Sequence, residues 1–398
     1  MIQEFTVKNF RSFKDEATLS FEATKDTAFE NYHVVEVAPG VRLLRLALIF
    51  GANASGKSNL LTAFNCLRSF WLRQTANDLD PTGAVPFLLD RDTPNKPTEF
   101  SLKFYIASTK YWYVLILDRL HVISEKLYLY KSTRPTLLFA RSCENGHSVV
   151  SFNPAAVKVS TAVLKEIAVK CLPNMSFFAA RRMVNCSLKY IDEACSWTRQ
   201  NTHGMIDPGS TMSDDTGKKI LHDESMKNYL LDFVHQADFN IAGINVEKKE
   251  TSDDFCTRFE HTVKNGRGTE KYILPYSLQS LGTRRAFSIE AAVCSALAND
   301  AFLPIDDVES SLHPELAELM LQQFLRSGSR SQLLVTTHYD PLLDTVDDLI
   351  RKDSVWFTEK GEDGSSDLYS LVEFKGLGKI KSFQKSYRNG AFGAVPNI

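Results

Sequence analysis

Residues 46–50 read LALIF and lead directly into residues 51–58, which read GANASGKS. An unbroken apolar run is typical of a strand buried on both faces of a parallel sheet. The spacing of glycine, lysine and serine that follows is typical of a phosphate-binding loop. Residues 59–64, NLLTAF, then read as a helix whose positive N-terminus faces the phosphates. A chance match in a glycine-containing loop is the alternative, but the flanking strand and helix favour a nucleoside triphosphate site.

The residue types in this loop suit phosphate chemistry. Gly51 and Gly56 let the backbone N–H groups curl around the phosphates, and Lys57 reaches the terminal phosphates. Ser58 supplies a hydroxyl to Mg²⁺. The loop residues expected to contact the nucleotide are Gly51, Asn53, Ala54, Ser55, Gly56, Lys57, Ser58 and Asn59.

A second apolar run, AFLPI at residues 301–305, ends in Asp306 and Asp307. A buried parallel strand would deliver these carboxylates to the carboxyl edge of its sheet, where Asp306 would hold Mg²⁺ through water. An ordinary strand ending in a polar turn is the alternative. A third run, QLLVTTH at residues 332–338, favours the functional interpretation because it would deliver His338 to the same edge, where it can sense a terminal phosphate.

The chain contains further short motifs, each at one position: VKNFRS at 7–12, PF at 86–87, EKL at 125–127, SLGT at 280–283 and the closing YRNGAFGAVP at 387–396. Together with the loop and the two later strands, their order resembles that of the ABC-type ATPases of the SMC and RecF kind. More closely, the chain resembles the OLD-like and abortive-infection ATPases of bacteria, often called AAA-family ATPases. The resemblance covers nearly the whole chain, and the joint order of the motifs is more specific than any one of them.

The resemblance implies an α/β fold: an ABC-type P-loop ATPase with a mixed-sheet core, an antiparallel β subdomain and a helical lobe or insertion. Residues 1–135 would form the first ATPase lobe with the phosphate loop and the β subdomain. Residues 136–299 would form the helical lobe with the SLGT signature, and residues 300–398 would return to the first lobe with the metal-binding strand, the histidine strand and the closing motif. Within the insertion, the polar stretch 201–219 is expected to be a flexible loop.

Periodicity gives a matching coarse picture. Apolar and polar residues alternate at 100–106 and 111–117, which predicts antiparallel strands. From about 136 to 250 the pattern turns helical, most clearly at 155–170 and 225–236. No run of three or four heptads is present, so a long coiled coil is not expected.

The resemblance also assigns roles. Lys57, Ser58 and Asp306 would bind Mg-ATP in one subunit, whereas Ser280 and Gly282 would cap the γ-phosphate of a neighbour's nucleotide. Two ATP molecules would then lie between the subunits of a homodimer or a higher homo-oligomer. A serine hydroxyl and a glycine N–H at the start of a helix form a good anion site, but a plain helix N-cap is the alternative.

The chain departs from the family pattern at Asp307, where a glutamate usually orients or deprotonates the attacking water. Aspartate is one methylene shorter, and a misplacement of about 1 Å can cost on the order of 10²-fold in rate, so slow hydrolysis is expected. Glu309 could substitute, and it completes the expected catalytic set with Asp307 and His338. Arg11, in VKNFRS, is the remaining expected nucleotide contact. ATPases of this kind usually have a loop glutamine that contacts Mg²⁺, and this sequence has no obvious one. Gln74 is a candidate, and the alternative is that Gln74 is an ordinary residue on a helix surface.

Composition bounds the class of protein. The 398 residues are 43% hydrophobic, but no apolar run approaches the roughly 18 residues that span a membrane. The N-terminus has no signal-peptide pattern. We therefore expect a cytoplasmic protein that does not enter a membrane. The seven cysteines are widely spaced without a CxxC pair, which indicates reduced thiols and no zinc site.

A net charge of −2 argues against a surface covered with phosphate-binding groups. Local basic stretches at 181–182, 218–219 and 264–271 are either DNA contacts or ordinary solvated surface. Arg284 and Arg285 follow the SLGT signature, where contact with a partner's phosphate and contact with DNA are both open.

Only 60 residues follow His338, between 338 and 398, which is too few for the metal-dependent nuclease domain of OLD-type proteins. A nuclease or toxin effector is therefore expected to be a separate protein. Four aspartates just after His338 suggest either a metal site or, more simply, a solvated helix surface: Asp340, Asp344, Asp347 and Asp348.

Three functional classes remain. The favoured class is an ATPase sensor or scaffold of an anti-phage system, which dimerises around ATP and controls the effector. The second is a RecF-like DNA-repair clamp, which ATP-dependent, salt-sensitive DNA binding would distinguish. The third, a membrane-transporter motor, fits poorly because the SLGT signature departs from the transporter pattern.

Overall fold

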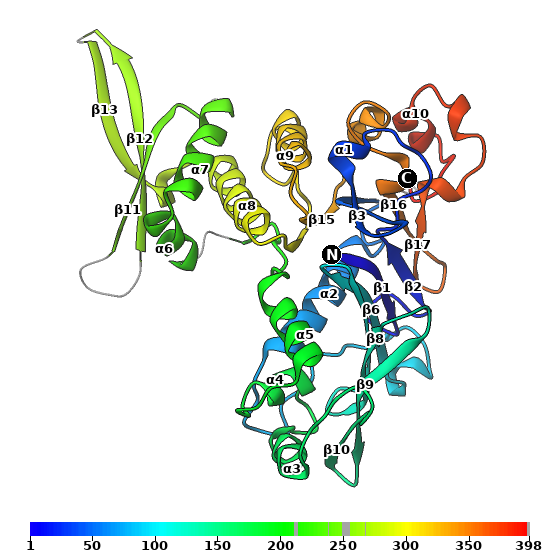
Figure 1. The fold of residues 1–398 in the computed structure, drawn as a ribbon. Coiled ribbons are helices and arrows are strands. Elements are labelled where there is room, and N and C mark those ends of the chain that lie inside the picture. Colours follow the sequence, from blue (N-terminus) through cyan, green and yellow to red (C-terminus); the bar gives the residue numbers. More distant parts are fainter. Residues whose placement is uncertain (211–213, 238, 249–254, 267, 396–398) are drawn as a thin grey trace.

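A five-stranded sheet carries the nucleotide loop (Figure 1). The computed structural model describes residues 1–210, 214–237, 239–248, 255–266 and 268–395. Within these, the sheet has the order β14-β15-β5-β16-β17, with bounds Phe302–Ile305, Gln332–Thr336, Leu46–Phe50, Val355–Lys360 and Ser366–Ser370. The first four strands are parallel and β17 is antiparallel to β16, which makes the sheet mixed. The α/β class expected from the sequence is confirmed.

The apolar run of β5 is continuous because both faces of this sheet are covered. Leu46, Leu48 and Phe50 belong to one core, which also contains the buried faces of α8 (Leu281–Ala298) and α9 (Pro314–Arg326). Ala47 and Ile49 belong to the other core, which they share with α2 (Lys57–Leu72). Successive strand residues point to opposite faces, so a doubly covered strand needs apolar residues at every position.

The second core joins α2 to an antiparallel sheet of seven strands, in the order β10-β9-β8-β7-β6-β1-β2. Their bounds are His147–Phe152, Pro135–Glu144, Val122–Tyr130, Thr109–Leu117, Thr98–Ile106, Ile2–Lys8 and Ala17–Ser20. The antiparallel strands expected at 100–106 and 111–117 are confirmed as β6 and β7. The sheet continues past residue 135 to Phe152.

The remaining elements form the helical lobe, a three-stranded sheet and the C-terminal segment. The three-stranded sheet, β11-β12-β13, projects from the body at the upper left of Figure 1, and we call it the arm. Its strands are Ile241–Lys248, Phe255–Asn265 and Gly268–Pro275; β3 and β4, Val34–Ala38 and Val41–Leu44, make a separate hairpin. The other α-helices are α1 Glu30–His33, α3 Thr161–Lys170, α4 Phe177–Arg181, α5 Lys189–Gln200, α6 Asp214–His222, α7 Glu224–Gln236 and α10 Phe383–Arg388. Short 3₁₀ turns lie at Thr93–Asn95, Tyr276–Leu278, Asp340–Thr345, Lys352–Ser354, Leu371–Glu373 and Leu377–Lys379.

The helical expectation for residues 136–250 is wrong in part, because β9, β10 and β11 fall in that range. These strands are half-exposed, so their alternation is blurred by polar and small residues on both faces. The helix expected at 155–170 begins only at Thr161, since Ser160 caps it by accepting a hydrogen bond from the Val163 N–H. The helix expected at 225–236 is confirmed as α7.

The stretch expected to be a flexible loop, 201–219, is partly paired with the central sheet. Thr202 and Ile206 form parallel bridges to Phe302 and Ile305, so the chain here runs along the free edge of β14. Asp306 also donates its N–H to the Ile206 carbonyl at 2.8 Å. Residues 211–213 of this stretch lie outside the described part of the chain, and α6 begins at Asp214.

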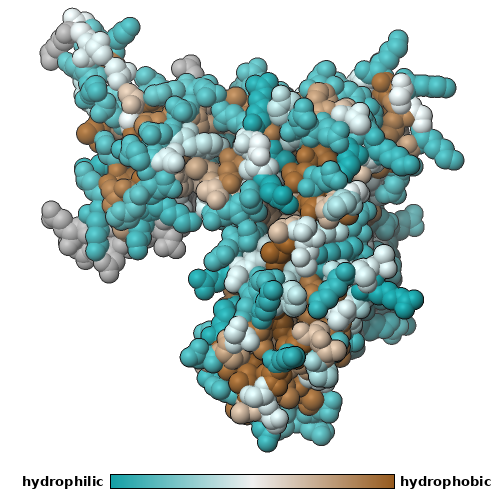
Figure 2. All heavy atoms as spheres, in the orientation of Figure 1, coloured by the Kyte–Doolittle hydropathy of each residue, from teal (hydrophilic) through white to brown (hydrophobic). Residues whose placement is uncertain are grey.

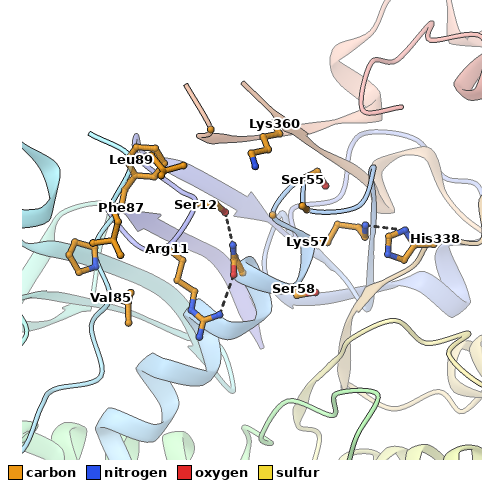
Figure 3. A pocket seen from close by; sticks show the side chains of 16 residues that line it. Arg11, Ser12, Ser55, Lys57, Ser58, Val85, Phe87, Leu89, His338 and Lys360 are labelled. Atoms are coloured by element: carbon orange, nitrogen blue, oxygen red, sulfur yellow. Dashed lines mark hydrogen bonds between the residues drawn. The ribbon is translucent and has the colours of Figure 1, made fainter. Parts of the chain in front are cut away.

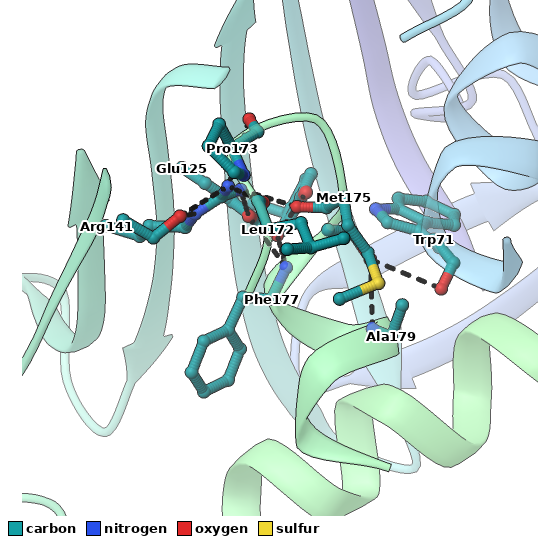
Figure 4. Close-up of polar contacts among 11 residues, drawn as sticks. Trp71, Glu125, Arg141, Leu172, Pro173, Met175, Phe177 and Ala179 are labelled. Carbon is teal, nitrogen blue, oxygen red and sulfur yellow. Dashed lines mark hydrogen bonds and ion pairs between the residues drawn. The ribbon is translucent and has the colours of Figure 1, made fainter. Parts of the chain in front are cut away.

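A buried ion pair fixes the far end of the antiparallel sheet (Figure 4). Arg141 Nη1 lies 3.0 Å from Glu125 Oε2, and neither side chain is exposed (0% each). Glu125 also accepts hydrogen bonds from the Phe177 N–H and the Tyr113 hydroxyl. Burial raises the pKa of Glu125, while Arg141 and these donors oppose the shift. Arg141 further donates to the carbonyls of Leu172, Pro173 and Met175. The EKL motif thus contributes Glu125 to the junction between the sheet and α4.

Polar side chains cover most of the face seen in Figure 2. Apolar side chains gather on that face over the lower part of the molecule, formed by α3–α5 and the end of the antiparallel sheet. Among the described residues, no helix combines the length and apolar character needed to cross a membrane.

Candidate nucleotide-binding site

The phosphate-binding loop has the backbone that its glycines permit. Gly56 has φ 116° and Gly51 has φ 152°, and Ala54 also lies in the left-handed region at φ 61°. A Cβ atom at Gly56 would collide with the Ser366 side chain, and one at Gly51 with the backbone of Thr358. The loop therefore needs both glycines, because the backbone has positive φ at each and packs closely there against Thr358 of β16 and Ser366 of β17.

The loop opens onto a cleft of about 570 Å³ at the N-terminus of α2 (Figure 3). Arg11 lies in this cleft, as expected, and its Nη1 donates to Asn59 Oδ1 at 3.3 Å. Asn59 in turn donates to the Ser12 hydroxyl at 2.8 Å. The cleft is lined by Arg11, Ser12, Ala54, Ser55, Gly56, Lys57, Ser58, Asn59, Val85, Pro86, Phe87, Leu88, Leu89, His338, Lys360 and Gly364. Gly51 and Asn53 belong to the loop but do not line the cleft.

Several lining residues were not predicted from the sequence. The segment 85–89 forms one wall, and Ser12 precedes the phosphate loop beside Arg11. Lys360, the last residue of β16, lies across the cleft from Phe87 in Figure 3, and Gly364 follows it in the turn before β17. The PF motif at 86–87 was the available signal for the wall. Gln74 is exposed beyond the end of α2 and does not line the cleft, so the proposed glutamine contact finds no support there.

Lys57 is buried and makes contacts that a phosphate could replace. Its Nζ donates to the carbonyls of Gly51 at 2.8 Å and Ala52 at 3.1 Å, and lies 3.3 Å from His338 Nδ1. Burial lowers the pKa of Lys57, and the nearby carboxylates, Asp307 foremost, oppose this shift. Phosphate oxygens would supply a stronger, charge-assisted acceptor than these neutral carbonyls.

Asp306 and Asp307 leave the end of β14 in different environments. Asp306 is buried (6% exposed), and its Oδ1 accepts a hydrogen bond from the Thr336 hydroxyl at 2.6 Å. Asp307 has φ 44°, and its N–H donates to the same Thr336 oxygen at 2.8 Å. Its Oδ1 is buried without a hydrogen bond, 3.4 Å from His338 Nε2. The carboxylates are thus held by a neighbouring strand, and one buried oxygen lacks a partner.

These residues fit the magnesium ion that the phosphate loop implies. Mg²⁺ takes hard oxygen ligands and keeps several waters. Ser58 supplies an exposed hydroxyl at the start of α2, and Asp306 supplies a buried carboxylate at the end of β14. The unpartnered oxygen of Asp307 is available to a water next to such an ion.

Glu309 contacts the segment that carries His338. Its Oε1 accepts a hydrogen bond from the His338 N–H at 2.5 Å, and its Oε2 accepts one from the Thr337 hydroxyl at 2.8 Å. Both oxygens accept hydrogen bonds, whereas Oδ1 of Asp307 accepts none and has only the contact with His338 at 3.4 Å. The geometry therefore favours Asp307 over Glu309 as the group that faces water.

Ser280 and Gly282 lie outside the cleft that contains Lys57. They line a separate cleft of about 440 Å³ between α8 and the segment after Asp307. Ser280 is the N-cap of α8 and accepts a hydrogen bond from the Thr283 N–H at 3.0 Å. At Gly282 a Cβ atom would lie 2.7 Å from the Ser311 carbonyl oxygen. Within one chain these two residues do not complete the site of Lys57.

Three of the arginines named as DNA or phosphate contacts are engaged with backbone carbonyls. Arg285 donates to the carbonyls of Asp207 and Asp306, and is only 4% exposed. Arg181 caps a turn through the carbonyls of Val184 and Cys186, and Arg182 binds those of Trp71 and Leu72 at the end of α2. A guanidinium that donates to backbone carbonyls has fewer N–H groups left for a phosphate, so this geometry gives DNA or phosphate contact at the three arginines no support.

Two lysines of the other basic stretches and one of the four aspartates also have partners within the chain. Lys219 donates to the Ser295 hydroxyl, and Lys271 pairs with Glu260 across the arm; Arg267 of the same basic stretch lies outside the described residues. Asp340 pairs with Arg388.

The C-terminal motif packs beneath β16 and β17. Tyr387 donates its hydroxyl to the Ala394 carbonyl, and Tyr369 donates to the Phe392 carbonyl. A Cβ at Gly393 would lie 2.7 Å from the Tyr369 hydroxyl. Pro396, the last residue of the motif, lies outside the described chain.

Comparison with known proteins gives one family match. Residues 46–154 and 181–344 match the family described as "AAA domain, putative AbiEii toxin, Type IV TA system". A comparison with curated proteins found no match.

Similar solved structures include three heads of SMC proteins. The SMC head domain from Thermotoga maritima is 14% identical, with a TM-score of 0.44, over 93% of this chain and 98% of that one. An SMC head bound to the C-terminal winged-helix domain of ScpA is 12% identical, with a TM-score of 0.49, over 94% and 99%. A Pyrococcus furiosus head bound to the C-terminal domain of ScpA is 10% identical, with a TM-score of 0.45, over 94% and 97%.

Proposed function

Because this chain belongs to the family described as "AAA domain, putative AbiEii toxin, Type IV TA system", we propose that it binds Mg-ATP and hydrolyses it slowly. One observation carries the proposal: three adjacent parallel strands end in the three parts of an ATPase site. Strand β5 leads into the phosphate loop, β15 into His338, and β14 into Asp306 and Asp307. Ligands of open α/β sheets bind at this carboxyl edge.

Each residue then has a role set by its chemistry. Lys57 and the N–H groups of the loop bind the β- and γ-phosphates, and Arg11 faces the same cleft. Ser58 and Asp306 would hold Mg²⁺, which offsets the negative charge of the phosphate oxygens. Asp307 orients the attacking water, and His338 contacts the γ-phosphate. Hydrolysis is slow because the shorter carboxylate holds the water less well.

We propose that the active form is a homodimer, or a higher homo-oligomer, in which Ser280 and Gly282 cap the γ-phosphate bound to the partner subunit. The support is geometric: these residues start a helix, line a cleft of their own and leave the site of Lys57 open in one chain. A hydroxyl and an N–H at a helix N-terminus suit an anion.

At the level of the cell, we propose a cytoplasmic sensor or scaffold of an anti-phage system that controls a separate nuclease or toxin. The family description, which names a toxin and a toxin–antitoxin system, supports this class. The RecF-like clamp loses support because Arg181, Arg182 and Arg285 are engaged within the chain.

The experiment that tests ATP binding is calorimetry on the Lys57→Ala variant. Removing the ammonium eliminates a charge-assisted phosphate contact, so we expect micromolar ATP binding to disappear, a loss of at least about 100-fold. Lys8→Ala is the matched control, since Lys8 is an exposed lysine paired with Glu99. In parallel, sedimentation of wild type with ATP and Mg²⁺ should report a dimer that Lys57→Ala does not form. Unchanged ATP affinity in Lys57→Ala would refute the site, and a wild type that stays monomeric with ATP would refute the shared arrangement.

A further inference from the structure

The signature helix α8 is attached to the end of β14 by a buried arginine. Arg285 lies in the second turn of the helix, and its Nη1 donates to the Asp207 carbonyl at 2.5 Å. Its Nη2 donates to the Asp306 carbonyl at 2.8 Å and lies 3.5 Å from the Asp307 carbonyl. The side chain therefore holds the backbone of both aspartates.

The charge around this guanidinium is consistent with a permanent attachment. Burial lowers the pKa of Arg285, but four carboxylates oppose the shift: Asp207, Asp306, Asp307 and Glu309. An arginine in such surroundings stays charged, and charge-assisted hydrogen bonds are about twice as strong as neutral ones. Without this donor the Asp306 carbonyl would lose its side-chain partner, whereas the carbonyls of Asp207 and Asp307 would keep the N–H groups of Ser210 and Ser310.

Asp307 needs such support because its backbone is strained. A non-glycine residue at φ 44° keeps this conformation only where its surroundings hold it. Thr336 accepts the Asp307 N–H from the side of β15, and the Ser310 N–H donates to the Asp307 carbonyl at 2.9 Å. From the side of α8, Arg285 holds the carbonyl of the preceding residue, Asp306, and lies 3.5 Å from that of Asp307.

The same helix touches the segment after Asp307 at a second point. Gly282 packs so closely on the Ser311 carbonyl that a Cβ would lie 2.7 Å from it. Ser280, which caps the helix, lies about one turn before Arg285. Because a helical turn is rigid, a displacement of the Ser280 end moves both contacts together.

We propose that Arg285 is a positioning residue for ATP hydrolysis: by holding the Asp306 carbonyl, it fixes the backbone just before Asp307 and ties the place of the Asp307 carboxylate to the Ser280 end of α8. This inference rests on the proposed ATPase function. Arg285 itself does not touch the nucleotide. It links the surface proposed to contact the partner's ATP with the water-orienting group of its own chain.

The test is single-turnover hydrolysis by Arg285→Met, which keeps an unbranched stem like the aliphatic part of arginine but removes the guanidinium and its donors. We expect at least a tenfold lower rate of chemistry with ATP affinity unchanged within about threefold, because the phosphate loop is not altered. The matched control is Arg182→Met, which also removes a guanidinium from two backbone carbonyls. It does so at the far end of α2, roughly 20 Å from Lys57 at 1.5 Å per residue. The control should lose stability but retain the wild-type rate.

Arg285→Lys keeps the proposal testable if the methionine variant does not fold. A lysine ammonium reaches one carbonyl and not two, so we expect a rate between those of wild type and Arg285→Met, again with unchanged ATP affinity. Wild-type chemistry in either folded Arg285 variant, or an equal loss in Arg182→Met, overturns the proposal. Failure of the proposed ATPase function would look different: wild type would not hydrolyse ATP, or Lys57→Ala would hydrolyse it as well as wild type. These results do not depend on Arg285, so failure of the ATPase function can be told apart from failure of the Arg285 proposal.

Discussion

Two groups of polar and charged residues, one fully buried and one open to solvent at His338, differ in how completely their hydrogen-bonding atoms are satisfied. In the antiparallel sheet, Glu125 and Arg141 form a pair whose hydrogen-bonding groups are met by a hydroxyl, an N–H and three carbonyls (Figure 4). At the nucleotide site, Lys57, His338 and Asp307 are spaced at 3.3 and 3.4 Å, and one Asp307 oxygen has no hydrogen bond (Figure 3).

The difference separates a structural role from a ligand-binding role. A fully satisfied buried network orders the chain around it, whereas an incompletely satisfied one leaves groups for a ligand to meet. Loss of a residue from the first group should therefore lower stability and spare ATP binding. Loss of a residue from the second group should spare stability and impair either ATP binding or ATP hydrolysis.

The largest effect is expected from Glu125→Ala. It leaves Arg141 charged and buried without its partner, and breaking one side of a buried pair costs about 3–5 kcal/mol. Urea unfolding should report this loss, with ATP affinity unchanged in the folded fraction. The control is Glu99→Ala, which breaks an exposed pair with Lys8. A loss as small as that of the control would mean that the network does not stabilise the fold.

A middle-sized effect is expected at Asp307. Asp307→Asn should slow single-turnover hydrolysis on the order of 10²-fold and retain the ATP-bound dimer, with little change in stability. Asp307→Glu should speed the chemistry if the short side chain limits it, since the longer one restores reach. Slower chemistry in Asp307→Glu would indicate that the strained backbone already brings the aspartate to the water. Undiminished chemistry in Asp307→Asn would exclude this residue from the mechanism.

The smallest effect is expected at Glu290, which combines features of both groups. It is fully buried on α8, and its Oε2 accepts a hydrogen bond from the Tyr229 hydroxyl at 2.6 Å, but its Oε1 has no partner. Burial raises the pKa of Glu290 to about 7, with the tyrosine opposing the shift. A carboxyl with a raised folded pKa stabilises the fold below its unfolded pKa, near 4.5, and that contribution is lost as the pH rises through 7.

Glu290→Gln should remove this dependence. The pKa shift of Glu290 corresponds to roughly 3 kcal/mol of unfolding free energy. Burying the N–H groups of the glutamine amide offsets part of this, so we expect the variant to be more stable than wild type by about 1 kcal/mol at pH 8. The measurement is the difference in unfolding free energy between wild type and variant from pH 5 to pH 8. A difference that stays flat over this range would place the pKa of Glu290 outside it.

Sequence patterns predicted the parts of the site that follow from local chemistry. The strand, loop and helix around Lys57 and the strands before Asp306 and His338 are where periodicity placed them. Nothing in the sequence indicated that Glu309 turns to the His338 backbone, because a turn after a strand leaves side-chain direction open. The arm was also missed, since its strands carry exposed residues on both faces and lack clear alternation.

Arg285 shows most plainly what could not be predicted from the sequence. Next to Arg284 it reads as part of a basic surface, and only the packing of α8 against β14 reveals that it is buried. The contact joins residues 285 and 306 through the fold, and no local pattern encodes it.

The arm and the helices α6 and α7 that precede it lie between two segments that both touch the candidate site. Residues 202–206, which come before α6, pair with the edge of β14, and the Ile206 carbonyl receives the N–H of Asp306. The chain leaves the arm through Tyr276–Leu278 into Ser280. The whole region from α6 to β13 is therefore joined to the rest of the chain next to β14 at one end and next to α8 at the other. A displacement of this region would be felt at Asp306 through Ile206 and at Ser280 through Tyr276–Leu278.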